Sequence, residues 1–381
     1  MARREASVLL VAGETSADLH ASKVVSRLRE LAPSVSVFGV GGDRLGAAGM
    51  ELSFHARDFS VVGFVEILRH VPRLKAAMDR LVRLAEDRAA PLAILVDYPG
   101  FNLLLARRLK KAGVRVLYYV SPQVWAWGEG RVRAIAERVD RMAVVFEFEK
   151  EFYRQRGVEV EFVGHPLLEE PLLATPTERS FGGSRDRSPV LGLLPGSRTQ
   201  EVRRHLGVML EAARLLAVEV PSLSVSVGRA PGIEPALIDR AVSRAGLPVT
   251  VAGPDDAYAV MRSSSALLVS SGTATLEAAC VGTPMAVVYR MAPLSYLIAR
   301  SVVRTRHIGL VNLVAGEEIV PEFVQGKATA PHLAAAVRPY LTDRAAAERV
   351  SGRLIGVRAK LGTPGASDRV ARMALAMLDD R

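Results

Sequence analysis

Leu92-Ala-Ile-Leu-Val96 is a run of five apolar residues that ends at the turn Asp97-Tyr-Pro-Gly-Phe-Asn102. A short run of bulky apolar residues, closed by a Pro-Gly pair, predicts a buried β-strand. An amphipathic stretch of helix length follows the turn. Strand, turn and helix in succession are the repeating unit of a parallel α/β sheet.

The same unit recurs along both halves of the chain. The expected strands cover 7–12, 35–40, 92–96, 115–120, 142–146 and 160–163, then 190–194, 223–227, 249–251, 266–269 and 285–288. Residues 169–189 break the pattern with prolines, glycines and scattered charges. We therefore expect an α/β protein with two doubly wound Rossmann-like domains facing each other across a cleft. They comprise residues 1–170, a linker over 171–189, and residues 190–381, which are wholly helical beyond Ala292.

The composition is that of a globular protein, with 49% hydrophobic and 24% charged residues. Cys280 is the single cysteine, and no run reaches the roughly 18 apolar residues of a spanning helix. These features predict a cytoplasmic protein. The net charge of +10 suits an anionic partner, although only 7 of the 50 basic residues are lysines. No basic run carries interleaved aromatic residues, so nucleic acid is not an expected partner.

In such sheets ligands bind beyond the carboxyl ends of the strands. The first strand leads into Ala12-Gly-Glu-Thr-Ser-Ala-Asp18, which lacks the dinucleotide fingerprint and therefore predicts no nicotinamide or flavin cofactor. Glu14, Ser16 and Asp18 are candidate acceptor-binding residues. For Asp18 the alternative is local, because Thr15 and Asp18 have the spacing of a capping box.

Asp97 stands where a stiff turn would hold an acid at the end of a strand, which is a suitable place for a general base. Asn102 is nearer the next helix, so we expect it to cap that helix. Both tryptophans of the chain lie in Tyr118-Tyr-Val-Ser-Pro-Gln-Val-Trp-Ala-Trp127. Their rings suit the wall of a sugar or acyl site, which makes Trp125 a candidate acceptor-binding residue.

The second half repeats the strand–turn–helix pattern at two turns that suit a diphosphate. Gly196-Ser-Arg198 offers a helix N-terminus and a guanidinium group, while Ser197 and Gln200 have capping-box spacing. Ser271-Gly-Thr273 leads into a helix that carries Glu277, whose carboxylate could accept hydrogen bonds from a ribose or simply face solvent. No Asp-x-Asp and no histidine or cysteine cluster with metal-ligand spacing occurs, so we expect no metal.

Two apolar stretches with basic edges, 61–74 and 294–313, have the composition of helices that lie at a membrane surface. Buried core helices look the same, and that alternative fits the second stretch slightly better.

These motifs together resemble the lipid-A-disaccharide synthase family along nearly the whole chain. The most specific match is Ser121-Pro-Gln-Val-Trp-Ala-Trp127. Further matches are Ala12-Gly-Glu14, Val62-Gly-Phe-Val-Glu66, Phe148-Glu149, Val163-Gly-His-Pro166, Leu194-Pro-Gly-Ser-Arg198, Ser271-Gly-Thr-Ala-Thr-Leu-Glu277, Tyr289-Arg290 and Asn312-Leu313.

The resemblance implies a GT-B fold and transfer of 2,3-diacylglucosamine from UDP to 2,3-diacylglucosamine 1-phosphate, with inversion, giving a β-1,6 disaccharide. Asp97 matches the family's candidate base. Arg198, Glu277, Arg290 and Asn312 match positions expected around UDP. The resemblance also implies work at the inner face of the cytoplasmic membrane, and it leaves a homodimer open.

Three residues depart from the family pattern: Ala17 replaces a usual glycine, Glu147 a usual proline, and Gly100 an acid found in some relatives. Two alternatives stay open on the sequence alone. One is a UDP-sugar epimerase of the same architecture, and the other is a non-catalytic lipid- or nucleotide-binding relative.

Overall fold

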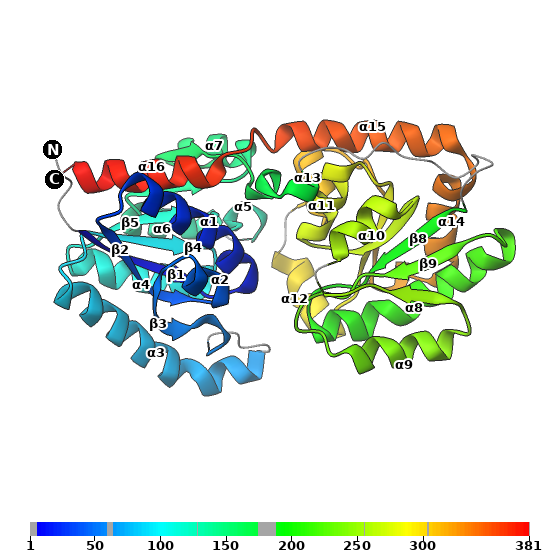
Figure 1. Cartoon of the computed structure of the whole chain (residues 1–381), viewed down its shortest axis with the longest axis horizontal. Coiled ribbons are helices and arrows are strands. Elements are labelled where there is room, and N and C mark those ends of the chain that lie inside the picture. Colours follow the sequence, from blue (N-terminus) through cyan, green and yellow to red (C-terminus); the bar gives the residue numbers. More distant parts are fainter. Residues whose placement is uncertain are drawn as a thin grey trace. The chain divides into compact units, whose positions relative to one another are not determined.

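The computed structural model describes residues 6–58, 64–127, 129–173, 188–254, 256–302 and 305–380. The chain forms two compact units, residues 1–166 with 362–381 and residues 167–361 (Figure 1). No described helix is long and apolar enough to cross a membrane.

The first unit is built on a seven-stranded parallel sheet in the order β3-β2-β1-β4-β5-β6-β7. Its strands are β1 (Ala6–Ala12), β2 (Val35–Gly41), β3 (Glu51–His55), β4 (Leu92–Val96), β5 (Arg115–Tyr119), β6 (Arg141–Val144) and β7 (Val160–Phe162). Its helices are α1 (Thr15–Leu31), α2 (Asp43–Ala47), α3 (Phe64–Asp87), α4 (Pro99–Lys111), α5 (Val124–Trp127), α6 (Val132–Arg138), α7 (Glu147–Arg154) and α16 (Ala366–Asp379). Helices α3, α4 and α6 share one core with the central strands, and α16 packs on α1 and β4.

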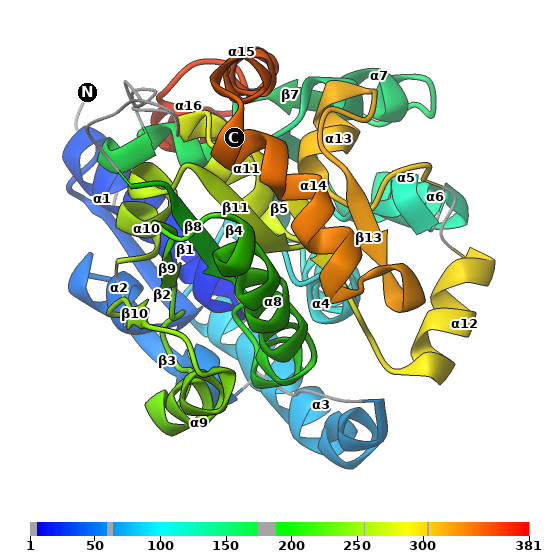
Figure 2. The ribbon, with the colours of Figure 1, turned by 90° about the vertical axis from the view of Figure 1, so that its right-hand side faces the viewer.

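The second unit has a six-stranded parallel sheet in the order β10-β9-β8-β11-β12-β13. Its strands are β8 (Val190–Leu194), β9 (Ser224–Val227), β10 (Val249–Val251), β11 (Ala266–Ser270), β12 (Met285–Tyr289) and β13 (Glu322–Val324). Its helices are α8 (Thr199–Glu219), α9 (Pro235–Ala245), α10 (Ala257–Ser263), α11 (Thr273–Val281), α12 (Pro293–Val302), α13 (Leu310–Ala315), α14 (Ala330–Thr342) and α15 (Arg344–Lys360). Figure 2 shows α8 and α14 on the near side of this sheet, where both contribute to its core.

In both sheets the strand order reverses beside the first strand of the unit, between β1 and β4 and between β8 and β11. At such a switch point the loops diverge and leave room for a ligand. The loops after these four strands are therefore the places where binding residues are expected.

The observed organisation differs from the sequence-based one in four respects. Residues 362–381 belong to the first unit and not to the second, and the first unit ends at Pro166 rather than at residue 170. The region beyond Ala292 is not wholly helical, because β13 lies there. Strand β3 was also missed; it has no buried residue, so no apolar run marks it. Most of the expected linker, residues 174–187, lies outside the described residues.

Helix α16 is tied to the first unit by side chains of both kinds. Val370 and Ala374 are fully buried, and the Arg27 Nε donates to Asp368 Oδ1 at 2.5 Å. The Arg369 Nε donates to the carbonyl oxygen of Val163 at 2.8 Å. The helix therefore completes the core of a unit whose other residues precede it by about half the chain or more.

We expect Ala374→Asp to destabilise the first unit by about 3 kcal/mol or more, because it buries an unpaired carboxylate. Ala376→Asp, on the exposed side of the same helix, is the matched control. Amide hydrogen exchange is the measurement: protection should fall in β1 and β4 of the first variant and stay unchanged in β8 and β11. Equal effects on both sheets would contradict the assignment of α16 to the first unit.

Candidate active site

The turn after β4 holds Asp97 in an uncommon backbone conformation. Asp97 and Tyr98 have φ angles of 47° and 50°, two consecutive left-handed residues without a glycine. Such residues cost on the order of 1–3 kcal/mol each and persist only where their surroundings hold them. The backbone of this turn therefore costs free energy of folding, as is common where a fold positions a functional side chain.

Two buried side chains hold this turn by the carbonyl oxygen of Asp97. The Tyr118 hydroxyl donates to it at 2.6 Å and the Asn102 amide at 2.7 Å. Both residues are fully buried, and burial raises the pKa of Tyr118 well above its ordinary value, so the hydroxyl keeps its proton. The backbone N–H of Asp97 also donates to the carbonyl oxygen of Tyr119 at 2.9 Å. The main chain of Asp97 is thus fixed on both sides.

Asn102 does not cap α4, contrary to the sequence-based expectation. The helix begins at Pro99, so Asn102 lies within its first turn. Its amide group points back to the carbonyl oxygens of Val96, at 3.2 Å, and Asp97. The side chain therefore positions the Asp97 turn.

The turn after β1 lies against the Asp97 turn. A Cβ atom added at Gly13 would come within 2.8 Å of the Tyr98 ring, so only glycine permits this close approach. Burial and the nearby Glu14 carboxylate raise the pKa of Tyr98. Glu14 precedes α1 and Ser16 is exposed in its first turn. Both acceptor candidates therefore lie at the N-terminus of α1, directly after β1.

Asp18 has a structural role that the capping-box spacing with Thr15 did not predict. Its buried carboxylate accepts backbone N–H bonds from Gly42 at 2.6 Å and from Arg44 and Leu45 at 3.2 Å. It thereby caps α2 instead of α1. These bonds, and an exposed fraction of 5%, correct the expectation that Asp18 contacts the acceptor.

The tryptophan-containing loop after β5 is held by a buried acid, Glu149, which sequence reasoning noted only as part of a motif. Glu149 Oε1 accepts from the Ser121 hydroxyl at 2.6 Å and from the Trp125 indole N–H at 3.0 Å. Its other oxygen accepts the backbone N–H of Phe146 at 3.1 Å. Val120, just before this loop, is a β-branched residue at φ 61°. The acid therefore fixes the orientation of Trp125, although burial raises the pKa of Glu149 to about 7.

His165 is buried beside the same loop, with its ring 5.3 Å from that of Phe146. Burial lowers its pKa to about 3, so the imidazole is neutral. Two departures from the family pattern also have local reasons. Glu147 opens α7, where a carboxylate is favourable, and Ala17 is buried in α1.

In the second unit, the turn after β8 is closed by Glu201. Its carboxylate accepts the backbone N–H groups of Ser197 at 3.1 Å and Arg198 at 3.3 Å, and it pairs with the Arg198 guanidinium at 3.5 Å. Helix α8 begins at Thr199, so the expected Ser197–Gln200 capping pair is wrong by one residue. Gly196, at φ 123°, leaves the space that Glu201 occupies. Arg198 stays largely exposed above this turn.

The turn after β11 carries Ser271, Gly272 and Thr273. The Ser271 hydroxyl donates to the carbonyl oxygen of Ile308 at 2.8 Å, and Thr273 is exposed at the first position of α11, after Gly272. Glu277 follows one turn later. Burial raises the pKa of Glu277 to about 7, while a hydrogen bond from Tyr258 opposes that shift. Glu277 is half-buried, so it is neither a fully solvent-facing residue nor part of the core.

His205 joins two loops of the second unit and was not found from the sequence. Its Nδ1–H donates to the carbonyl oxygen of Pro195 at 2.8 Å, which leaves Nε2 to accept the Arg290 backbone N–H at 2.9 Å. Burial lowers the pKa of His205, which keeps this neutral form. The Arg290 guanidinium in turn donates to the carbonyl oxygen of Ala328 at 2.6 Å. Arg290 is thus held through its backbone N–H by His205 and through its guanidinium by the carbonyl oxygen of Ala328.

Asn312 has no hydrogen-bonding capacity left for UDP, which corrects the expectation from the sequence. Its amide donates to Val320 and to Glu322 Oε1, each at 2.8 Å. Its oxygen accepts the backbone N–H groups of Ile319 and Val320 at 2.8 and 3.1 Å. The residue is fully buried and fixes the chain around β13.

The two sheets and their polar turns define the class of protein. Two doubly wound parallel sheets, each with polar turns at its switch point, are the architecture of a GT-B protein. Among the described residues there is no cluster of three or more potential metal-ligating side chains.

Comparison with known proteins gives the particular family. The family described as lipid-A-disaccharide synthetase matches residues 8–361. The lipid-A-disaccharide synthase of Geobacter metallireducens is 44% identical over 373 residues, and that of Myxococcus xanthus 43% over 375, each covering 97% of both chains. The chain belongs to the lipid-A-disaccharide synthase family, and it is a glycosyltransferase of lipid A biosynthesis.

Solved structures at low identity agree on the fold alone. A UDP-GlcNAc 2-epimerase from Neisseria meningitidis, bound to UDP-GlcNAc, aligns with a TM-score of 0.63 at 12% identity, covering 97% of this chain and all of the other. The calicheamicin glycosyltransferase CalG4 aligns at 0.60 and 15%, covering 99% of each. The fold is shared by both reaction types, and the family match favours transfer over epimerisation.

The buried Glu149 makes stability depend on pH in a defined direction. Its pKa is about 7 in the folded protein against 4.5 normally, so the folded state holds the proton more tightly. The corresponding stabilisation is complete below about pH 4.5 and is lost as the pH rises through 7. Relative to Glu149→Gln, the wild type should therefore lose on the order of 2–3 kcal/mol of unfolding free energy between pH 4.5 and 8.

Urea denaturation across this pH range measures the difference. Glu151→Gln is the control, because Glu151 lies on the same helix but is exposed and its pKa is lowered by Gln155 and Arg154. The difference in unfolding free energy between the wild type and Glu151→Gln should therefore show no such fall, because both proteins keep Glu149. A constant difference between the wild type and Glu149→Gln would disprove the assignment.

Proposed function

We propose that the chain transfers 2,3-diacylglucosamine from its UDP carrier to 2,3-diacylglucosamine 1-phosphate, with inversion and with Asp97 as the general base. The observation that carries this proposal is the Asp97 turn, which keeps two strained residues under two buried hydrogen bonds. Strain of this kind collects at functional sites. Membership of the family supports the substrates.

In the proposed step the acceptor's primary hydroxyl oxygen attacks the anomeric carbon of the donor. The bond between that carbon and the diphosphate oxygen breaks, and UDP leaves with the electron pair. The Asp97 carboxylate takes the hydroxyl proton. A single displacement inverts the anomeric carbon, which is the logic of inverting glycosidases.

The donor side of the proposal uses the turns of the second unit. Arg198 is exposed beside Gly196 and Ser197, and it would meet the diphosphate as a charge-assisted donor. The turn of Ser271, Gly272 and Thr273, with Glu277 and Arg290, would receive the remainder of UDP. Glu201 already takes two N–H groups at this end of α8, so most of the neutralisation falls to arginine rather than to the helix terminus.

On the acceptor side, Glu14 and Ser16 would contact the sugar, and Trp125 would present its ring to the acceptor. The indole N–H of Trp125 is already bonded to Glu149, so its contribution is apolar contact. We also propose peripheral attachment to the inner face of the cytoplasmic membrane. The stretch 61–74 that suggested it lies outside the described residues at 61–63, and the side chains of 64–71 are not described either. In the stretch 294–313, Leu297 is 63% exposed.

We expect Asp97→Asn to lower kcat by about 10²–10⁴-fold, because the amide keeps the shape of the side chain but cannot take a proton. The dissociation constant of UDP should not change, since the donor turns belong to the other unit. Arg198→Ala is the reciprocal variant, with UDP affinity lowered by roughly 1.5–3 kcal/mol.

UDP release with the two acylated substrates and calorimetry with UDP provide the two measurements. If Asp97→Asn kept most of its activity, the base would have to be sought elsewhere, first at Glu14. If Arg198→Ala bound UDP as tightly as the wild type, the donor site would be wrong while the base assignment stood.

A further inference from the structure

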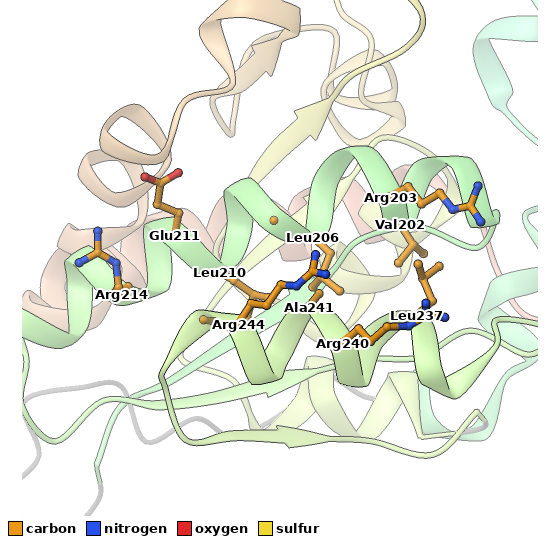
Figure 3. A pocket seen from close by; sticks show the side chains of 12 residues that line it. Val202, Arg203, Leu206, Leu210, Glu211, Arg214, Leu237, Arg240, Ala241 and Arg244 are labelled. Carbon is orange, nitrogen blue, oxygen red and sulfur yellow. The ribbon is translucent and has the colours of Figure 1, made fainter.

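Helices α8 and α9 of the second unit line a cavity of about 640 Å³ that is open to solvent (Figure 3). This volume lies in the range of small-molecule sites. The cavity begins at Val202, after the turn that carries Arg198, and continues along both helices away from it. None of the residues assigned above to the donor or the acceptor lines it.

The floor of the cavity is apolar. Leu206 and Leu210 of α8 and Leu237 of α9 turn toward the space between the two helices (Figure 3). Leu206 and Leu210 are only 2% and 3% exposed and belong to the core of the unit. The apolar surface that reaches the cavity therefore comes from the half-buried Leu237, Ala241 and Ala245. A hydrocarbon chain on this floor would be removed from water at no cost in polar groups.

Gly207 keeps the cavity open at its centre. It is exposed in the middle of α8, and a Cβ atom added there would meet no atom within 4 Å. A glycine inside a helix costs about 1 kcal/mol relative to alanine. Packing within the protein does not require glycine here, whereas a ligand lying close to the helix would.

The rim of the cavity is basic. Arg203 and Arg214 lie on α8, and Arg240 and Arg244 lie one turn apart on α9. All four are exposed, and within the described part of the chain none of them has an ion-pair partner. Glu211 is the acidic side chain of the described lining. Four guanidinium groups and one carboxylate leave three positive charges around an apolar floor.

We propose that this cavity binds an anionic phospholipid-type amphiphile, with an acyl chain on the apolar floor and the phosphoryl group among the guanidinium groups. Guanidinium groups match phosphate geometry. An extended peptide fits less well, because backbone pairing needs a sheet edge and both walls are helices. Single-stranded nucleic acid uses aromatic stacking platforms, and the described lining holds none. The cavity shares no residue with the Asp97 turn or with the UDP turns, so the proposal does not depend on their assignment.

The test uses the full chain and dihexanoyl phosphatidylglycerol below its micelle concentration, with calorimetry as the readout. Saturable binding is expected. Glycerol 3-phosphate, which lacks the chains, and dihexanoyl phosphatidylcholine, which lacks the net charge, should each bind at least 10-fold more weakly. Equal binding of glycerol 3-phosphate would reduce the site to a phosphate site and overturn the proposal.

Two variants of the cavity separate the contribution of the arginine charges from that of the apolar floor. Arg240→Gln with Arg244→Gln should weaken binding by about 30-fold, at roughly one kilocalorie per charge. Gly207→Leu keeps all the charges but fills the cavity, and it should weaken binding at least 10-fold. The control is the double variant Arg349→Gln with Arg353→Gln, which changes two exposed arginines at the same spacing on α15. Its dissociation constant for the amphiphile should stay within twofold of the wild-type value.

Unchanged affinity in both cavity variants would place the amphiphile elsewhere and overturn the proposal. So would displacement of the amphiphile by an equal concentration of polyglutamate, which would indicate a surface for acidic proteins. Loss of activity with Asp97→Asn leaves this proposal untouched, so the two can fail independently.

Discussion

The carbonyl oxygen of Asp97, held by the Tyr118 hydroxyl and the Asn102 amide, is the contact on which the proposed chemistry depends. Two consecutive left-handed residues persist only where their surroundings hold them, and these two buried donors act at the carbonyl oxygen of the first. With them, a carboxylate stands at the switch point of the sheet, in a turn that lies against the loop after β1 through Gly13. Buried polar groups here serve position rather than stability.

The same principle organises the other loops. Glu149 fixes the Trp125 loop, His205 ties the turn after β8 to Arg290, and Glu201 closes the turn that bears Arg198. In each case a buried or half-buried side chain uses its hydrogen bonds on the main chain or on a neighbour. The groups left exposed for a ligand, such as Arg198 and Thr273, are few.

Sequence periodicity predicted the parts of the fold that bury apolar runs. Strands β4 and β8 were expected at their observed bounds, and both sheets are parallel as expected. The short strand β10, which has no buried residue, was also expected at its observed bounds. Strand β3, which is exposed to half-buried, and the three-residue β13 carry no such run, so they were missed. The placement of α16 could not be predicted, because an amphipathic helix does not indicate which distant core it completes.

The sequence predicted which loops carry the candidate site, but not what several of the side chains in those loops do. Spacing suggested that Asp18 is a helix cap or a ligand contact, whereas its partners are main-chain groups 24 to 27 residues away, which lie close only after folding. Asn102 was expected to cap the next helix, whereas its amide turns back to main-chain oxygens five and six residues before it. Asn312 was expected near UDP from the family resemblance, and its side-chain amide is fully hydrogen-bonded within the protein. Glu149 and His205 were passed over because burial, which gives them their function, is not visible in a motif.

The turnover number of Tyr118→Phe, with Thr283→Val as the matched control, tests most directly whether the Asp97 turn places the base. Each change removes one buried hydroxyl that donates to a carbonyl oxygen, at 2.6 Å in Tyr118 and 2.7 Å in Thr283. If the Asp97 turn places the base, Tyr118→Phe should lower kcat by about 10- to 100-fold with UDP affinity unchanged, because small displacements of a reacting group are costly. Thr283→Val should lose similar stability and keep its kcat. Equal kcat in the wild type and Tyr118→Phe would contradict the account.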